Sequence, residues 1–138
     1  MIHLITLGVQ DLNKSKNFYT DLFKIPPAQS SNDHIVFFDL PCAKLALYSR
    51  EALAEDAKVS TNGSGFKGIT LAFLVRNKSD VDIFLAKAES LGAKITKPAQ
   101  DVFWGGHSGY FQDFDKHLWE IAWNPFFPFN LNGSVSIP

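Results

Sequence analysis

A short internal repeat is the feature of this sequence that most restricts its fold. Ile5-Thr6-Leu7 recurs as Ile69-Thr70-Leu71, 64 residues further along the chain. Asn13-Lys14-Ser15 recurs as Asn77-Lys78-Ser79 at the same spacing of 64. Because chance matches would fall at unrelated spacings, the two identities indicate a duplicated unit. We therefore expect two similar halves within the 138 residues, a length that suits one ordinary domain.

The first half, residues 1–49, reads as a strand, a helix and further strands. Residues 2–9 alternate apolar and polar side chains and predict a strand, after which Asn13 can cap a helix. The apolar face of that helix is made of Phe18, Tyr19, Leu22 and Phe23. Segments 34–40 and 43–49 are apolar enough to predict two strands.

The second half, residues 68–125, repeats this order. A strand is predicted over 68–75, and Ser79 can cap the following helix while Asp82 reaches back across its first turn. The buried stripe of the helix is expected to be Val81, Phe84, Leu85, Ala88 and Leu91. The remaining strands are expected at 94–97, before a loop through Pro98, and as a tightly turned pair within 107–123.

The two halves together predict an α+β fold of two tandem βαβββ units in a single domain over residues 1–138. Residues 50–67, rich in Ser, Gly, Asn and charge, are the expected linker. Neither helix is long enough to be stable alone, so each is expected to pack on one face of its sheet. Curled mixed sheets with helices on the outer face would enclose a cavity. The Phe- and Pro-rich tail, 126–138, is expected to cover the cavity mouth or a partner subunit.

Charge and hydropathy argue against several kinds of partner. The 13 basic and 14 acidic residues nearly balance and form no basic stripe, which argues against nucleic acid. No apolar run approaches the roughly 20 residues of a membrane span, and the N-terminus lacks a charged leader, so we expect a cytoplasmic protein. The single cysteine, Cys42, lies in an apolar strand pattern and is predicted to be a buried, inert thiol.

Two longer motifs frame the duplicated plan: ITLGVQDLNKSKNFYTDLF at 5–23 and WGGHSGYFQDFDKHLWEIAWNP at 104–125. Together they resemble the vicinal oxygen chelate superfamily, which groups glyoxalase I, bleomycin-resistance proteins and extradiol dioxygenases. The resemblance implies a homodimer whose concave sheet faces surround a divalent metal. It also implies four metal ligands, usually His, Glu or Gln, one from the first and one from the last strand of each unit.

Only one of the four ligand positions implied by the resemblance carries a usual metal ligand. Glu120 falls on the position in the last strand, whereas Leu4 and Ala46 occupy the two positions of the first unit. At the start of the second unit, the repeat spacing of 64 places the ligand position at Gly68. Alignment on the valine that follows the strand places it at Thr70. One carboxylate does not hold a divalent ion against water, so we expect no metal cofactor.

Glu120 lies between Trp119 and Ile121, and three hypotheses account for it. It is a solvated residue at a strand edge, or an inherited ligand position now paired with Lys44 or Tyr48. Alternatively it is a buried acid whose pKa is raised by desolvation, which would make it a proton donor, a base or an anchor for a cationic ligand.

Other residues are candidates for contact with a ligand beside Glu120. His107 enters the neighbouring strand among glycines that leave room for a ligand. The remaining candidates are Thr6, Tyr48, Phe66, Trp104, Tyr110 and Phe111. The family's usual Asp-Pro-Asp-Gly turn is here Asp113-Phe114-Asp115-Lys116, and because Lys in the left-handed region costs about 1 kcal/mol relative to Gly, we expect a reshaped turn.

These observations favour a metal-free protein that binds a small hydrophobic or aromatic molecule in the cavity between its units. The alternative is a metal-dependent lyase, isomerase or dioxygenase, in which Zn, Ni, Mn or Fe held by Glu120 and unusual partners chelates two vicinal oxygens. A third hypothesis is metal-free acid–base catalysis by Glu120 with Tyr110 or His107. Whether the chain is an enzyme stays open at this point.

Overall fold

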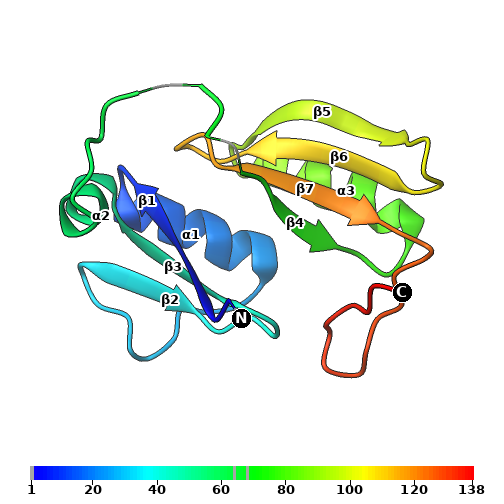
Figure 1. Ribbon diagram of the computed structural model, residues 1–138, viewed down its shortest axis with the longest axis horizontal. Coiled ribbons are helices and arrows are strands. Elements are labelled where there is room, and N and C mark those ends of the chain that lie inside the picture. Colours follow the sequence, from blue (N-terminus) through cyan, green and yellow to red (C-terminus); the bar gives the residue numbers. More distant parts are fainter. Residues whose placement is uncertain (1, 64, 68) are drawn as a thin grey trace. The chain divides into compact units, whose positions relative to one another are not determined.

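The computed structural model describes residues 2–63, 65–67 and 69–138, and the chain divides into two compact units, Met1–Lys67 and Gly68–Pro138 (Figure 1). Each unit contains one mixed sheet, of three strands in the first and four in the second. Figure 1 shows a long helix behind the strands of each sheet. The predicted α+β class with two mixed sheets is therefore confirmed.

The N-terminal unit is built on a three-stranded sheet with the order β1-β3-β2. Strand β1 is parallel to β3, and β2 is antiparallel to β3. Its elements are β1 (Leu4–Val9), α1 (Leu12–Phe23), β2 (Ile35–Phe38), β3 (Lys44–Ser49) and α2 (Arg50–Asp56). Helix α2 occupies the start of the segment that we predicted as a linker, because Ser49 caps it by accepting the N–H of Ala52.

The N-cap of helix α1 lies two residues before the one that we predicted. Asp11, not Asn13, is the N-cap, and its side chain accepts the N–H of Lys14 at 2.9 Å. The buried face consists of Ser15, Phe18, Tyr19 and Leu22, which includes three of the four predicted residues. The Tyr19 ring lies 6.4 Å from that of Phe38, which places α1 on one face of the sheet.

The C-terminal unit is built on a four-stranded sheet with the order β4-β7-β6-β5. Strand β4 is parallel to β7, and the other neighbours are antiparallel. Its elements are β4 (Leu71–Leu74), α3 (Lys78–Ser90), β5 (Lys94–Asp101), β6 (His107–Gln112) and β7 (Leu118–Trp123). This βαβββ order is the predicted one, whereas the described residues of the N-terminal unit form two strands after α1 and then helix α2.

Helix α3 covers one face of this sheet, and its cap differs from our prediction. Asn77, not Ser79, precedes the helix, and Asp82 bonds to His107 of β6 rather than to the first turn. The fully buried side chains are Val81, Leu85 and Ala88, while Phe84 stacks on Phe73 of β4 with ring centroids 4.9 Å apart. The predicted stripe therefore faces the sheet.

Strand β5 is longer than expected, because it continues through Pro98 to Asp101. Its pairing with β6 shifts register on both sides of Lys97. Proline fits here because β5 is an edge strand, where a missing N–H removes no bond to a further strand. Gly109 of β6 makes the irregularity possible, since an added Cβ there would lie 2.8 Å from the Lys97 carbonyl oxygen and 2.9 Å from the Ala99 nitrogen.

The two helices correspond at a spacing of 66 rather than 64. The residues that point to the sheets are related in pairs of that spacing: Ser15 with Val81, Tyr19 with Leu85 and Leu22 with Ala88. The short sequence identities are therefore two residues out of structural register. With the structural spacing Leu4 corresponds to Thr70, so Thr70 and not Gly68 is the equivalent position; Gly68 itself lies outside the described residues.

The position of Cys42 and the character of the helices bear on two further predictions. Cys42 is exposed and lies in the turn between β2 and β3, not buried in a strand, because Pro41 and its neighbours end β2 at Phe38. Within the described ranges, none of the helices has both the length and the apolar character needed to cross a membrane.

Gly109 generates a stability prediction. We expect Gly109→Ala to lower the free energy of unfolding by about 2–3 kcal/mol, because its Cβ would meet Leu85 Cδ1 at 2.5 Å as well as backbone atoms of β5. Denaturant unfolding followed by circular dichroism measures this. Ala86→Ser, on the exposed side of α3, is the control and should change stability by less than about 0.5 kcal/mol. An unchanged midpoint for Gly109→Ala would contradict the packing described above.

Candidate functional site

Glu120 lies on the face of the C-terminal sheet opposite α3, which we call the Glu120 face. Trp119 and Ile121 on either side of it are buried, and the Trp119 ring stacks on that of Phe111 at 6.3 Å. Because successive side chains of a strand point to opposite faces, Glu120 points away from the core formed with α3. It is partly exposed, and its strand β7 has a neighbour on each side and is not an edge strand.

A row of directly opposed residues crosses this face. Ala72 of β4 pairs with Glu120 of β7, Glu120 pairs with Tyr110 of β6, and Tyr110 pairs with Lys97 of β5. Directly opposed residues of neighbouring strands have their side chains on the same face. The row therefore brings an acid, a phenol and an ammonium group together on one side of the sheet.

Tyr110 is the partner of Glu120 within this row. Their direct pairing brings the phenol, a hydrogen-bond donor, next to the carboxylate, an acceptor. Burial first, then the negative charge of Glu120 and hydrogen bonding to it, raise the pKa of Tyr110 above its ordinary value. Tyr110 is therefore a protonated donor at neutral pH. The expected partners Lys44 and Tyr48 belong to the N-terminal unit, where Lys44 forms an ion pair with Asp39.

His107, which we expected near Glu120, lies on the α3 side of the sheet. Its Nδ1 is 2.8 Å from Asp101 Oδ1, and its Nε2 is 2.9 Å from Asp82 Oδ2. A hydrogen bond from Lys78, and after it one from His107, lowers the pKa of Asp101. Both ring nitrogens of His107 are thus engaged in joining α3 to β5 and β6. His107 is not available to Glu120, so the predicted pairing of these two residues is wrong.

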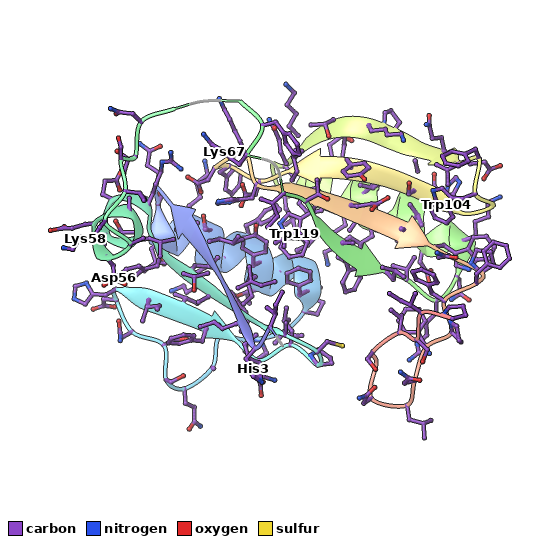
Figure 2. All side chains as sticks on the ribbon, viewed as in Figure 1. His3, Asp56, Lys58, Lys67, Trp104 and Trp119 are labelled. Carbon is purple, nitrogen blue, oxygen red and sulfur yellow. The ribbon has the colours of Figure 1, made fainter. Side chains whose placement is uncertain are left out.

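Two aromatic candidates also lie away from Glu120. Phe111 is fully buried between the sheet and α3, because it is one residue out of phase with Tyr110. Trp104 lies against Gly106 in the turn between β5 and β6, as the label at that end of the sheet shows (Figure 2). Gly106 precedes Tyr110 by four residues, roughly 13 Å along a strand. Neither ring adjoins the Glu120 carboxylate.

The remaining candidates belong to the N-terminal unit. Thr6 pairs with Ala46 and Gly8 pairs with Tyr48, so Thr6 and Tyr48 lie on the sheet face opposite α1. Phe66 is 70% exposed and lies outside the helices and strands. Their contribution to ligand binding stays a prediction.

The family's metal-ligand positions can now be compared by register. Thr6 of β1 pairs with Ala46, and Ala72 of β4 pairs with Glu120. Since Thr6 and Ala72 are 66 residues apart, Ala46 is the structural equivalent of Glu120. The four positions, Leu4, Ala46, Thr70 and Glu120, supply two hydrocarbon side chains, one hydroxyl and one carboxylate. Such a set does not fit a divalent metal, which needs at least three N, O or S ligands from the protein.

Among the described residues, one other group places three potential metal ligands together. Atoms of Asp113, Asp115 and His117 in the turn after β6 lie within 4.8 Å of one another. Asp113 Oδ1 accepts the N–H groups of Asp115 at 2.9 Å and His117 at 2.8 Å, and its Oδ2 is 2.8 Å from His117 Nδ1. Because Asp113 is buried and bonded in this way, its carboxylate stabilises the turn.

The turn is not reshaped as we had expected. Lys116 adopts the left-handed conformation, with φ 66°, in the place where the family has glycine. The hydrogen bonds of Asp113 hold the turn in this conformation despite the steric cost of a Cβ.

Lys97 is the residue of the row that sequence analysis missed. Its Nζ lies 5.9 Å from the centroid of the Tyr110 ring. The sequence carries no clear signal for this position, because the irregular pairing of β5 interrupts the alternation that would assign its face.

Comparison with known proteins identifies the family. The family model described as Glyoxalase/Bleomycin resistance protein/Dioxygenase superfamily matches residues 1–121. The chain belongs to this superfamily. The resemblance found in the two sequence motifs is thereby confirmed.

Similar proteins include two described as "Fosfomycin resistance protein FosX". The one from Listeria monocytogenes is 32% identical over 117 residues, which cover 85% of this chain and 84% of that protein. The one from Listeria innocua is 31% identical over 117 residues, with the same coverage.

Solved structures give the same family. A glyoxalase-related enzyme from Fulvimarina pelagi is 34% identical with a TM-score of 0.89, and the match covers 99% of this chain and 97% of that one. Lactoylglutathione lyase from Agrobacterium tumefaciens is 20% identical with a TM-score of 0.68, covering 90% and 93%. This second likeness shows the fold alone.

The Tyr110–Glu120 pair generates a spectroscopic prediction. In the wild-type protein Tyr110 should ionise above the value of about 10 that is usual for tyrosine. Glu120→Gln should lower the pKa of Tyr110, because it removes the negative charge that disfavours phenolate. Ultraviolet difference titration measures this, with Tyr110→Phe identifying the contribution of Tyr110. The same titration curve in wild type and Glu120→Gln would contradict the pairing.

Proposed function

We propose that this superfamily member works without a metal and binds a small molecule against the Glu120 face of its C-terminal unit. The observation that carries the proposal is the direct pairing of Glu120 with Tyr110 across β7 and β6, at the position where the family holds a metal ligand. The residues equivalent to the other ligand positions, Leu4, Ala46 and Thr70, support a site without a metal.

The pair determines which groups of a ligand it can recognise. The Glu120 carboxylate offers several acceptor sites, and the single hydroxyl of the opposed Tyr110 can occupy only one of them. The phenol oxygen keeps its own acceptor capacity. Two adjacent acceptors favour a ligand with hydrogen-bond donors, such as a hydroxyl or ammonium group.

The surroundings of the pair favour an apolar ligand body. Strand alternation puts small or aliphatic side chains on the same face as Glu120, namely Ala72, Leu74, Leu118 and Ala122. A few polar groups within an apolar surface are typical of small-molecule sites.

The same pair could also transfer a proton without a metal. Glu120 would act as the base towards an acidic hydrogen of the ligand, while protonated Tyr110 would donate to the oxygen on which charge develops. Of the two partners that the sequence offered for Glu120 in acid–base catalysis, Tyr110 is the one that lies directly opposite it.

Ligand binding tests the proposal directly. In a ligand-observed NMR screen of small aliphatic and aromatic alcohols and amines, Glu120→Gln and Tyr110→Phe should each weaken binding about tenfold, because each removes a charge-assisted hydrogen bond. Glu89→Gln, an exposed acid on α3, is the matched control and should bind as wild type does. Elemental analysis that found one tightly held ion per chain, lost in Glu120→Ala, would overturn the metal-free proposal.

We also propose the homodimer that the family resemblance implies, and light scattering on the same samples tests it.

A second candidate function is resistance to fosfomycin, a small phosphonate epoxide. The observation that favours it is the 32% identity to a fosfomycin resistance protein over 85% of this chain. Opening of the epoxide by water would need a base that takes a proton from the water as its oxygen bonds to a ring carbon. It would also need an acid that gives a proton to the epoxide oxygen as the ring C–O bond breaks. The Glu120 carboxylate and the protonated Tyr110 are suited to these two tasks.

Growth of a fosfomycin-sensitive bacterial host tests this second function. Expression of the chain should raise the minimal inhibitory concentration of fosfomycin, and Glu120→Gln should abolish the increase at equal protein level. Phosphorus NMR with purified protein, with and without added Mn, Ni or Zn, shows whether the drug is consumed or only bound. Sensitivity equal to that of the empty host would exclude this function.

A further inference from the structure

Lys97 lies on the same face of the C-terminal sheet as Glu120 and Tyr110. It lies directly opposite Tyr110, so its side chain shares the Glu120 face, and it is only partly exposed. Lys44 and Lys78 form ion pairs with Asp39 and Asp101. In contrast, across the ranges that the structure describes, Lys97 forms no ion pair with a carboxylate.

The backbone, not a salt bridge, determines where Lys97 points. The register of β5 against β6 shifts before and after it, and Pro98 follows immediately. Gly109 accommodates this segment, because its lack of a Cβ lets the Lys97 carbonyl oxygen and the Ala99 nitrogen come close to β6. The register shifts of the edge strand β5 therefore direct Lys97 over the Glu120 face.

The contact of the Lys97 ammonium group with the Tyr110 ring is weak. The distance of 5.9 Å from Nζ to the ring centroid is at the outer limit of about 6 Å for a cation–π interaction. The ammonium group keeps its three donors for another partner. Lys97 lies on one side of Tyr110 and Glu120 on the other, so groups of opposite charge flank the phenol.

We infer that Lys97 is a specificity-determining residue that binds an anionic oxygen group of the ligand. This inference rests on the proposed function and narrows its ligand class. The ligand would carry a carboxylate or phosphonate at Lys97 and a hydroxyl or ammonium donor at Glu120, with Tyr110 between them. Neutral molecules of the same shape would bind less well, since they leave the Lys97 charge unpaired.

An NMR titration of the labelled wild-type protein with methylphosphonate tests the anion site, and the neutral dimethyl ester of methylphosphonate is the matched probe. We expect methylphosphonate to shift the signals of Lys97 and Tyr110 and the ester to leave them unchanged. Lys97→Met should weaken methylphosphonate binding at least about tenfold. Lys87→Met removes the same charge from α3 on the opposite side of the sheet, and it should bind as wild type does.

A further variant gives a readout that a purely structural lysine would not change. Glu120→Gln should strengthen methylphosphonate binding, because it removes a negative charge near the anion, whereas it weakens ligands that bind through a donor group alone. Absence of a methylphosphonate shift, or equal binding by Lys97→Met, would overturn the role of Lys97. If the Glu120 and Tyr110 variants still weakened alcohols and amines, the proposed function would stand. If they did not, the proposed function itself would fail.

Discussion

Packing of α3 against one face of the C-terminal sheet is the interaction on which the candidate site depends. Leu85 of α3 is buried there, and Trp119 and Ile121 of β7 are buried on the same side. Strand alternation then forces Glu120 to the opposite face. Gly109 lets the helix approach closely, because it has no Cβ to separate Leu85 from β6. The packing that stabilises the unit therefore also decides which polar groups are left to meet a ligand.

Polar groups on the two sides of this sheet have different roles. On the α3 side, His107 is bonded at both ring nitrogens, to Asp82 and to Asp101. Such a histidine joins secondary-structure elements and has no free nitrogen for chemistry. On the other side, Glu120 and Tyr110 form a pair that retains acceptor capacity. A residue type that suggests catalysis is thus informative only when its face and partners are known.

The two units share a fold but differ at the positions where the family holds a metal. Ala46 and Glu120 occupy equivalent places in β3 and β7, next to the equivalent residues Thr6 and Ala72. The acid and its phenolic partner occur in the C-terminal unit alone, because Ala46 pairs with Phe37 in the other sheet. The two strand pairs therefore match in backbone register, while the side chains at these positions differ in chemistry.

Elements that depend on local periodicity could be predicted from the sequence alone. The helical stripe around Leu85 and the alternation around Glu120 were both predicted, because each follows from the geometry of a single helix or strand. The tertiary structure decided the rest. The true repeat spacing, the side of the sheet that His107 joins and the place of Lys97 all depend on contacts between distant segments. The irregular pairing of β5 beside Gly109 has no local signature, since it results from how closely two strands and a helix can approach.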